Sequence, residues 1–354
     1  MKASAFIFLA LLVFFITSCS TDTKGVENES YFPPISGTEW ETNSPTSLNW
    51  NQNALPDLMD YLELKNTKGF IILIDGKIVV ENYFNNHSAT TNWYWASAGK
   101  TLTSIMMGIA VQEGYINLDE KISEYIGNGW TSLPLAKENL ITNKHLLTMT
   151  SGIEDLINDD CVTPECLTYN ADAGTRWAYH NVYVKLQDVI SAASNQPFED
   201  YFTEKLKNKI GMNGSWITLE NNRVYFSTTR SMARFGLLIL NKGKWENEVI
   251  VNSDFIQNAT STSQNINKSY GYLWWINGQS SFHLPQSQFE FQGSIIPSGP
   301  TDMFMALGKN DQKIYVIPSK KMVVIRMGNA ADEANAALSD FDDVLWQKIN
   351  AVIN

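Results

Sequence analysis

Residues 95–111 read WASAGKTLTSIMMGIAV, a nearly continuous apolar run with one charged side chain, Lys100. Apolar residues on every side are typical of a helix buried inside a protein, so we expect a helix that starts near Ser97 and runs to Gly114. Burying a charged side chain in such a helix costs free energy unless the charge is paired. Lys100 therefore indicates a chemical role, and Ser97 lies three residues before it on the same helical face.

Two kinds of site could contain this stretch. Gly99 and Lys100 could end a phosphate-binding loop, but the first glycine of that motif would stand where the chain has Tyr94. Alternatively, Ser97 is a nucleophile at the N-terminus of the helix, whose positive field favours a developing anion, and Lys100 helps to remove its proton. A serine N-cap with a lysine that extends to solvent is the structural alternative.

Acyl transfer by a serine also needs a second proton-handling group. Tyr-x-Asn occurs at 83–85, where it ends a predicted strand and is interpreted as structural, and again at 179–181. A tyrosine beside a lysine cation is able to take the serine proton, which suggests this role for Tyr179. Asn181 would fix the lysine or the substrate by hydrogen bonds; a buried core tyrosine with no catalytic role is the alternative.

Strand-like segments lie near both ends of the chain and helices lie between them. Residues 69–84 form two β-rich runs joined by Asp75 and Gly76, which predicts a tight hairpin. The other strand-like segments are 270–278, 302–308, 313–318 and 322–328, and helices are expected from Leu55 to before Gly69, over 228–243 and over 331–349. This order predicts an α+β fold with one antiparallel sheet built from both ends of the chain, flanked by helices and interrupted by a mainly helical region over 115–220.

The first residues are typical of an exported protein. Residues 1–18 combine a lysine, a short apolar run and small residues, as a secretory signal does, and the segment before Cys19 resembles a bacterial lipobox. We expect a lipid on Cys19, a flexible tether over 19–47 and a single catalytic domain over 48–354. The expected location is the bacterial cell envelope, anchored to a membrane on its periplasmic or surface side.

Composition limits the partners and the cofactors. The 354-residue chain has a net charge of −11 and no basic runs, which argues against nucleic acid. Cys161 and Cys166 predict a local disulfide in an exported protein, with two free thiols as the alternative. The chain has four histidines and no metal-binding pattern, so no metal is expected. An acidic cluster, expected in a solvated loop or at the mouth of a pocket where it would favour a substrate amine, consists of Glu154, Asp155, Asp159 and Asp160.

Several segments, in order, resemble those of class C β-lactamase-related serine hydrolases. They are residues 95–126, 141–153, 177–186, 228–245 and 270–276, and the resemblance extends over roughly residues 55–350. The family includes penicillin-binding proteins, D-aminopeptidases, carboxylesterases and 6-aminohexanoate-oligomer hydrolases. The resemblance implies the β-lactamase/transpeptidase-like fold, with Ser97 as nucleophile, Lys100 as its partner, Tyr179 as general base and Asn181 as polar support.

One motif of that family is absent. Penicillin-recognising members carry Lys-Thr/Ser-Gly on a strand beside the serine, and this chain has no such tripeptide. The corresponding position is Gly308, followed by Lys309, whose N–H would form an oxyanion hole with that of Ser97. The missing cation favours an esterase or an amidase of the aminohexanoate-oligomer kind. A β-lactamase or D,D-peptidase is the first alternative, and a non-catalytic acyl-binding sensor is the second.

The expected substrate is a small ester, amide or peptide, and the resemblance implies no metal or organic cofactor. Neither the particular substrate nor the oligomeric state follows from the sequence.

Overall fold

The computed structural model describes residues 30–157, 160–219, 222–332 and 338–354. At its centre is a six-stranded sheet with the order β2-β1-β13-β12-β11-β8, in which all neighbouring strands are antiparallel. Its strands are β1 (Thr67–Ile74), β2 (Lys77–Tyr83), β8 (Trp275–Ile276), β11 (Phe304–Gly308), β12 (Gln312–Ile317) and β13 (Met322–Gly328). Strands from both ends of the chain thus form one sheet, and the predicted α+β class is confirmed.

The hairpin predicted over 69–84 is present as β1 and β2. Its two turn residues, Asp75 and Gly76, both have positive φ angles of 49° and 82°. Such angles match the turn to the right-handed twist of the strands, which is why aspartate followed by glycine favours a hairpin here.

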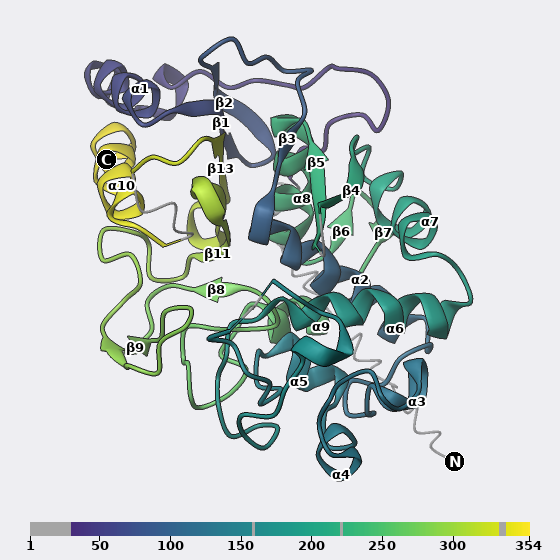
Figure 1. The fold of residues 1–354 in the computed structure, drawn as a ribbon. Coiled ribbons are helices and arrows are strands. Elements are labelled where there is room, and N and C mark those ends of the chain that lie inside the picture. Colours follow the sequence, from purple (N-terminus) through teal and green to yellow (C-terminus); the bar gives the residue numbers. More distant parts are fainter. Residues whose placement is uncertain (1–29, 158–159, 220–221, 333–337) are drawn as a thin grey trace, which may run out of the picture.

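Helices cover both faces of this sheet (Figure 1). The first and last helices, α1 (Leu55–Leu64) and α10 (Asp340–Ile353), lie side by side on one face, and α8 (Thr229–Leu240) lies on the other. The N-cap of α8 is Thr228, whose side chain accepts a hydrogen bond from the Ser231 N–H. The final helix begins later than the predicted residue 331, because a capping box of Ser339 and Asp342 starts it.

A mainly helical region lies below the sheet in Figure 1, as expected. Its helices are α2 (Lys100–Gln112), α3 (Ser123–Ile126), α4 (Leu135–Glu138), α5 (Asn143–Leu147), α6 (Lys185–Ser194) and α9 (Ser253–Ala259), with α7 (Phe198–Phe202) nearby. Small sheets are formed by β3 (Trp93–Tyr94), β5 (Asn222–Ser227) and β4 (Ser215–Leu219), by β6 (Lys244–Trp245) with β7 (Glu248–Val249), and by β9 (Ser281–Phe282) with β10 (Phe291–Gln292). Single turns of 3-10 helix that matter below are η3 (Ala96–Gly99), η4 (Pro164–Cys166), η5 (Asn181–Val184) and η7 (Lys309–Asp311).

The described part of the expected tether, residues 30–47, packs against the domain. Trp40 is nearly buried and donates a hydrogen bond from Nε1 to the Gly76 carbonyl at 2.7 Å. Arg234 of α8 donates to the carbonyls of Pro33 and Pro34, and its guanidinium lies over the Trp40 ring. These distant contacts hold the segment in place. The expected signal over 1–18 and Cys19 lie outside the described residues.

The strand predicted over 270–278 is reduced to Trp275 and Ile276. Leu273 has a φ of 64°, which interrupts an extended chain, and its N–H donates to the carbonyl of Leu147 in α5 instead. This segment therefore joins the sheet to the helical region, and its aromatic side chains pack near the site described below.

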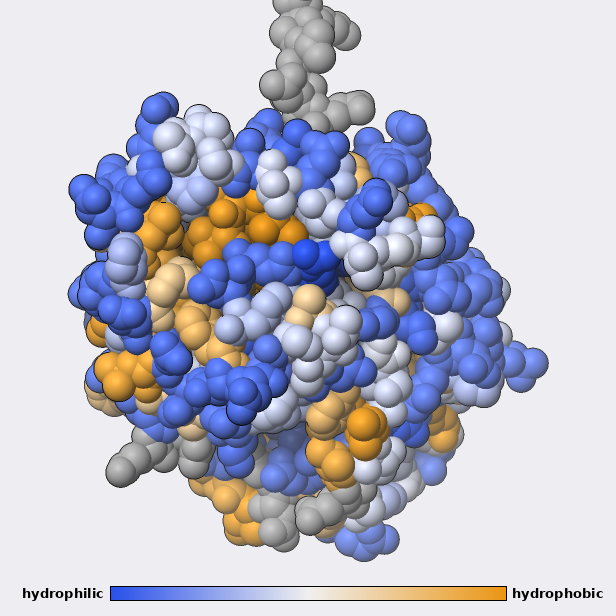
Figure 2. Space-filling view, turned by 90° about the horizontal axis from the view of Figure 1, so that it is seen from above, coloured by the Kyte–Doolittle hydropathy of each residue, from blue (hydrophilic) through white to orange (hydrophobic). Residues whose placement is uncertain are grey.

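Seen from the top of Figure 1, hydrophilic residues cover most of the molecule and hydrophobic residues show between them (Figure 2). Within the described ranges, no helix is both long enough and apolar enough to span a bilayer.

Candidate active site

Ser97 lies at the entrance of the buried helix α2. It belongs to η3, a single 3-10 turn that leads directly into α2, so the predicted helix start near this residue is confirmed with a tighter first turn. The preceding Ala96 has a φ of 47°, a left-handed conformation that is strained for alanine and that is often retained at functional sites. Backbone N–H groups in the first turn of a helix have no partner within it, so they are available to an anion beside Ser97.

Lys100 is buried, with 2% of its surface exposed, and its ammonium connects two of the predicted site residues. Its Nζ donates to Ser97 Oγ at 2.9 Å and to Asn181 Oδ1 at 2.8 Å. Two aromatic rings lie on it as well, with the centroid of Tyr179 at 4.9 Å and that of Tyr183 at 4.5 Å. Two ring faces and two oxygen acceptors thus surround the ammonium of Lys100 in this apolar helix.

Tyr179 is half-buried beside Lys100, and aromatic residues of the 270–276 segment fix its ring. The ring stacks on Trp275 at a centroid distance of 5.8 Å and meets the edge of Tyr270 at 6.2 Å. The structure therefore places Tyr179 and Asn181 of the second Tyr-x-Asn beside Lys100, the residue that also contacts Ser97. The Tyr-x-Asn at 83–85 has structural contacts instead: Tyr83 donates to Glu81, and Asn85 donates to the Thr67 carbonyl in the hairpin.

His180, between these two residues, points into the protein. Its Nδ1 accepts a hydrogen bond from the Val182 N–H at 2.8 Å, which caps η5, and only 1% of the residue is exposed. Burial and the nearby charge of Lys100 lower the pKa of His180 to about 4. The imidazole is therefore neutral at physiological pH and caps η5, the turn that begins at Asn181.

The end of β11 forms the opposite wall of the site. A Cβ atom at Gly308 would lie only 2.5 Å from the Trp95 carbonyl oxygen and 2.9 Å from the Ala98 nitrogen, so the absence of a side chain lets the strand approach η3. Lys309 follows at the rim of the pocket. The structure thus places Gly308 against η3 and Lys309 in the lining of the same pocket as Ser97.

The turn after Lys309 is held by a buried cation. Asn310 and Asp311 both have positive φ angles, of 60° and 59°, and Arg326 donates from Nη1 to both of their carbonyls. The Asn310 side chain also donates to the Tyr94 hydroxyl at 2.6 Å. These contacts keep the turn, and with it the backbone of Lys309, in one position.

Ser97 and Lys100 line a cavity of about 220 Å³. The remaining lining residues are Ala96, Asp160, Asn181, Tyr183, Asn222, Arg223, Val224 and Lys309. Sequence reasoning missed Tyr183 and the residues of β5, because nothing in their local pattern distinguishes them from core and surface positions. Three of the charged residues are basic and one, Asp160, is acidic, so the cavity carries both signs of charge.

The acidic cluster expected from the sequence is divided among different roles. Asp155 is fully buried and pairs with Arg176 at 2.6 Å, which corrects the expectation that it lies in a solvated loop. Glu154 accepts from Asn170, whereas Asp160 lies in the cavity and accepts from Asn181 Nδ2 at 2.6 Å. Asp159 lies outside the described residues.

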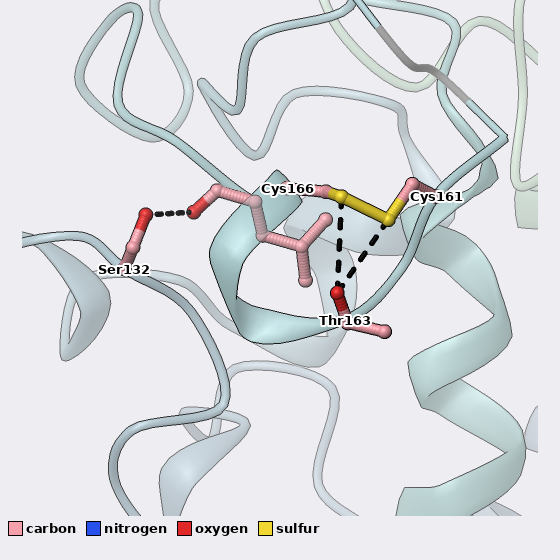
Figure 3. The surroundings of a disulfide bond; sticks show 5 residues. Ser132, Cys161, Thr163 and Cys166 are labelled. Carbon is pink, nitrogen blue, oxygen red and sulfur yellow. Dashed lines mark hydrogen bonds between the residues drawn. A yellow bond between two sulfur atoms is a disulfide. The ribbon is translucent and has the colours of Figure 1, made fainter.

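The residue that follows Asp160, Cys161, forms the predicted disulfide with Cys166 (Figure 3). Thr163 contacts both sulfur atoms through its hydroxyl, at 3.5 and 3.7 Å. Ser132 donates to the carbonyl of Leu167 at 3.0 Å, which fastens the end of the loop to the helical region. The described ranges contain no group of three or more histidine, cysteine, aspartate or glutamate side chains that could hold a metal ion.

The match to a family follows this geometry. A model of the family described as Beta-lactamase matches residues 69–345, most of the chain, and the protein belongs to that family. Its family and fold are those of the β-lactamase-related serine hydrolases.

Solved structures with the same fold come from proteins of different activities. A Bacillus anthracis protein provisionally named a 6-aminohexanoate-dimer hydrolase has a TM-score of 0.68 and 19% identity, with 92% of each chain covered. The octameric penicillin-binding protein homologue from Pyrococcus abyssi has a TM-score of 0.61 and 16% identity, covering 85% of this chain and 77% of that one. EstCE1, described as a hydrolase with promiscuous acyltransferase activity, has a TM-score of 0.62 and 11% identity, covering 88% and 99%. At these identities the similarities establish the fold alone.

Proposed function

We propose that this protein hydrolyses a small ester or amide through an acyl-enzyme on Ser97. The observation that carries the proposal is the contact of Lys100 Nζ with Ser97 Oγ at 2.9 Å, inside a cavity where Asn181 Oδ1 holds the same ammonium. A serine hydroxyl is a weak nucleophile, and an adjacent group that accepts its proton or stabilises the developing charge is what covalent catalysis requires.

In the proposed reaction, Ser97 Oγ attacks the carbonyl carbon while its proton passes to Tyr179, whose ionised form the Lys100 charge stabilises. The N–H groups of Ser97 and Lys309 bind the oxyanion. Collapse of the tetrahedral intermediate breaks the ester C–O or amide C–N bond, and Tyr179 returns the proton to the leaving group. Water then attacks the acyl-enzyme, with the same tyrosine as base, and releases the acid.

The size of the cavity suggests a short acyl group. A volume of about 220 Å³ is below the 300–1,000 Å³ of pockets that enclose drug-sized ligands. We therefore expect p-nitrophenyl acetate and butyrate to react faster than long-chain esters. The same fold carries hydrolase and acyltransferase activity in EstCE1, which is in line with acyl transfer as the proposed reaction class.

The test is a stopped-flow assay of p-nitrophenyl butyrate with the protein and with Ser97→Ala, Lys100→Ala and Tyr179→Phe. The proposal is supported if the parent protein releases p-nitrophenol steadily and all three variants do not. Tyr83→Phe is the matched control, because Tyr83 begins the other Tyr-x-Asn and contacts Glu81 instead of the site. A single stoichiometric burst without turnover would indicate the acyl-binding sensor. Activity that survives in Ser97→Ala would exclude the proposed nucleophile.

A β-lactamase or D,D-peptidase is the second candidate, because two cations, Arg223 and Lys309, line the cavity and could meet a substrate carboxylate. Nitrocefin and a D-alanyl-D-alanine peptide test it directly. If the protein hydrolyses either compound, and Arg223→Gln or Lys309→Gln raises KM for that compound, the result would favour this candidate over the esterase.

We also propose that the protein is exported and anchored by a lipid on Cys19. The signal-like residues 1–18 and the disulfide, which persists in oxidising compartments, support this location. The full-length chain and Cys19→Ser should be compared by labelling with a fatty-acid probe and by membrane fractionation. Label and membrane association that are equal in both proteins would contradict the anchor.

A further inference from the structure

We propose that Asp160 is a positioning residue for the reaction, which orients Lys100 toward Ser97 by fixing the amide of Asn181. This inference rests on the proposed function for its catalytic consequence. Asp160 Oδ1 accepts from Asn181 Nδ2 at 2.6 Å, Asn181 Oδ1 accepts from Lys100 Nζ at 2.8 Å, and Lys100 Nζ donates to Ser97 Oγ at 2.9 Å. One continuous chain of hydrogen bonds therefore links a carboxylate of the loop to the nucleophile.

The direction of each hydrogen bond follows from the chemistry of the groups. An ionised carboxylate only accepts hydrogen bonds, so Asn181 must present its NH₂ group to Asp160. Its carbonyl oxygen is then turned toward Lys100, whose ammonium only donates. The reverse orientation of the amide would place NH₂ hydrogens against the ammonium and the amide oxygen against the carboxylate. Asp160 thus excludes the orientation of Asn181 that would repel Lys100.

Two contacts fix the position of Asp160, one covalent and one polar. The next residue is Cys161, which is bonded to Cys166. From the other side of the cavity, Asn222 of β5 donates to the same Asp160 oxygen at 3.5 Å. The carboxylate therefore joins the disulfide loop, η5 and the β4–β5 hairpin at the mouth of the cavity.

A different role for Asp160, the binding of a substrate cation, would leave another kinetic signature. A carboxylate that binds substrate changes KM for cationic substrates and leaves a neutral ester unaffected. A positioning residue changes kcat for a neutral ester, because the misplaced ammonium affects the acylation step. The neutral substrate p-nitrophenyl butyrate distinguishes these roles.

The experiment compares Asp160→Ala and Asp160→Asn with the parent protein. Displacement of a catalytic group by about 1 Å costs about 100-fold, so we expect kcat for Asp160→Ala to fall by about 10- to 100-fold with KM within about twofold. Asp160→Asn keeps an oxygen acceptor and should recover a large part of kcat. Unchanged kcat in Asp160→Ala, an effect on KM alone, or no recovery in Asp160→Asn would overturn the inference.

Glu154→Gln is the matched control. Glu154 is an acidic residue of the same loop, but its carboxylate accepts from Asn170 and from backbone N–H groups of residues 155 and 156. It should keep the activity of the parent. An equal loss in Glu154→Gln would mean that order in the loop as a whole, and not the carboxylate of Asp160, affects the rate.

A second measurement does not depend on turnover. The side-chain NH₂ signals of Asn181, assigned with Asn181→Asp, should be shifted away from those of a solvent-exposed asparagine in the parent protein and should return toward them in Asp160→Ala. Identical NH₂ signals in both proteins would contradict the inference even if the enzyme is active. If the parent protein has no esterase activity but the signals change as expected, the proposed function fails and the orientation of Asn181 by Asp160 stands.

Discussion

The Gly308 backbone lies directly against the carbonyl oxygen of Trp95, two residues before Ser97, the proposed nucleophile. This contact joins the end of β11 to η3, so it fixes the distance between Lys309, the residue directly after the strand, and the turn that contains Ser97. An oxyanion hole made of two N–H groups from these two elements depends on that spacing.

We predict that Gly308→Ala lowers kcat by at least about 10-fold and destabilises the protein by about 1–3 kcal/mol, because the new methyl group overpacks the contact. Chemical unfolding and steady-state kinetics with p-nitrophenyl butyrate measure both effects. Gly99→Ala is the control, since a Cβ at Gly99 would have its nearest neighbours at an ordinary 3.8 and 3.9 Å. Wild-type kcat in Gly308→Ala would mean that the strand does not set the geometry of the site.

The neutral His180 predicts a loss of stability in mild acid. Burial lowers its native pKa to about 4, whereas the unfolded chain binds the proton near the ordinary value of about 6.5. The neutral imidazole of His180 therefore makes its full contribution to the free energy of unfolding above about pH 7. That contribution, about 3 kcal/mol in total, is lost as the pH falls from about 6.5 toward 4. Urea unfolding at pH 7.5 and 4.5 should show a smaller difference for His180→Asn than for the parent protein. An equal difference in both proteins would contradict the assignment.

A buried ion cluster beneath the β11–β12 turn is expected to be essential for stability. Lys313 is fully buried and pairs with Asp311 at 3.1 Å and with Asp342 at 2.8 Å. Burial raises the pKa of Asp311, but Lys313 and the Ala331 N–H outweigh it, so the net pKa lies below its ordinary value.

Lys313→Met would leave two buried carboxylates without their cation. We expect a loss of about 3–5 kcal/mol in the free energy of unfolding, measured by urea denaturation. Lys348→Met is the control, because its partner Asp57 is 72% exposed and such pairs contribute about 0–1 kcal/mol. Equal losses in the free energy of unfolding for the two substitutions would show that burial does not make the cluster more important for stability than an exposed ion pair.

The disulfide should matter more for the reaction than for the overall fold. It spans only five positions of the sequence, so we expect its loss in Cys161→Ser/Cys166→Ser to cost at most about 2 kcal/mol. Because the same loop carries Asp160, kcat should fall as it does in Asp160→Ala. Reductant should slow the parent protein and have no further effect on the double variant. Full activity of the double variant would show that the loop keeps Asp160 in place without the bond.

Features with a local cause could be predicted from the sequence. The hairpin turn follows from Asp75 and Gly76, and the buried helix with its lysine follows from residues 95–111. The Ser97, Lys100 and Asn181 cluster could also be anticipated, because the two motifs have recognisable spacings.

Features that depend on distant contacts could not be predicted. The segment 30–47 contains polar and turn residues typical of a linker, but Arg234 and the sheet hold it through backbone carbonyls. Asp160 belongs to an acidic run whose members are chemically alike, and only the fold brings this one to Asn181. Likewise, Arg223 reaches the cavity because β5 passes beside it, which no local pattern in residues 222–227 indicates.

The pairing of Thr67 with Gly328 has a consequence for the order of folding. During synthesis, β1 has only β2 beside it until almost the whole chain has left the ribosome, because β11, β12 and β13 all follow residue 303. Non-local pairing of this kind is slow, and an unpaired strand edge can recruit another chain. A product that ends before β11 would carry Ser97, Lys100 and Tyr179 but no wall opposite the nucleophile. The candidate active site is therefore completed only when the last strands of the sheet have paired.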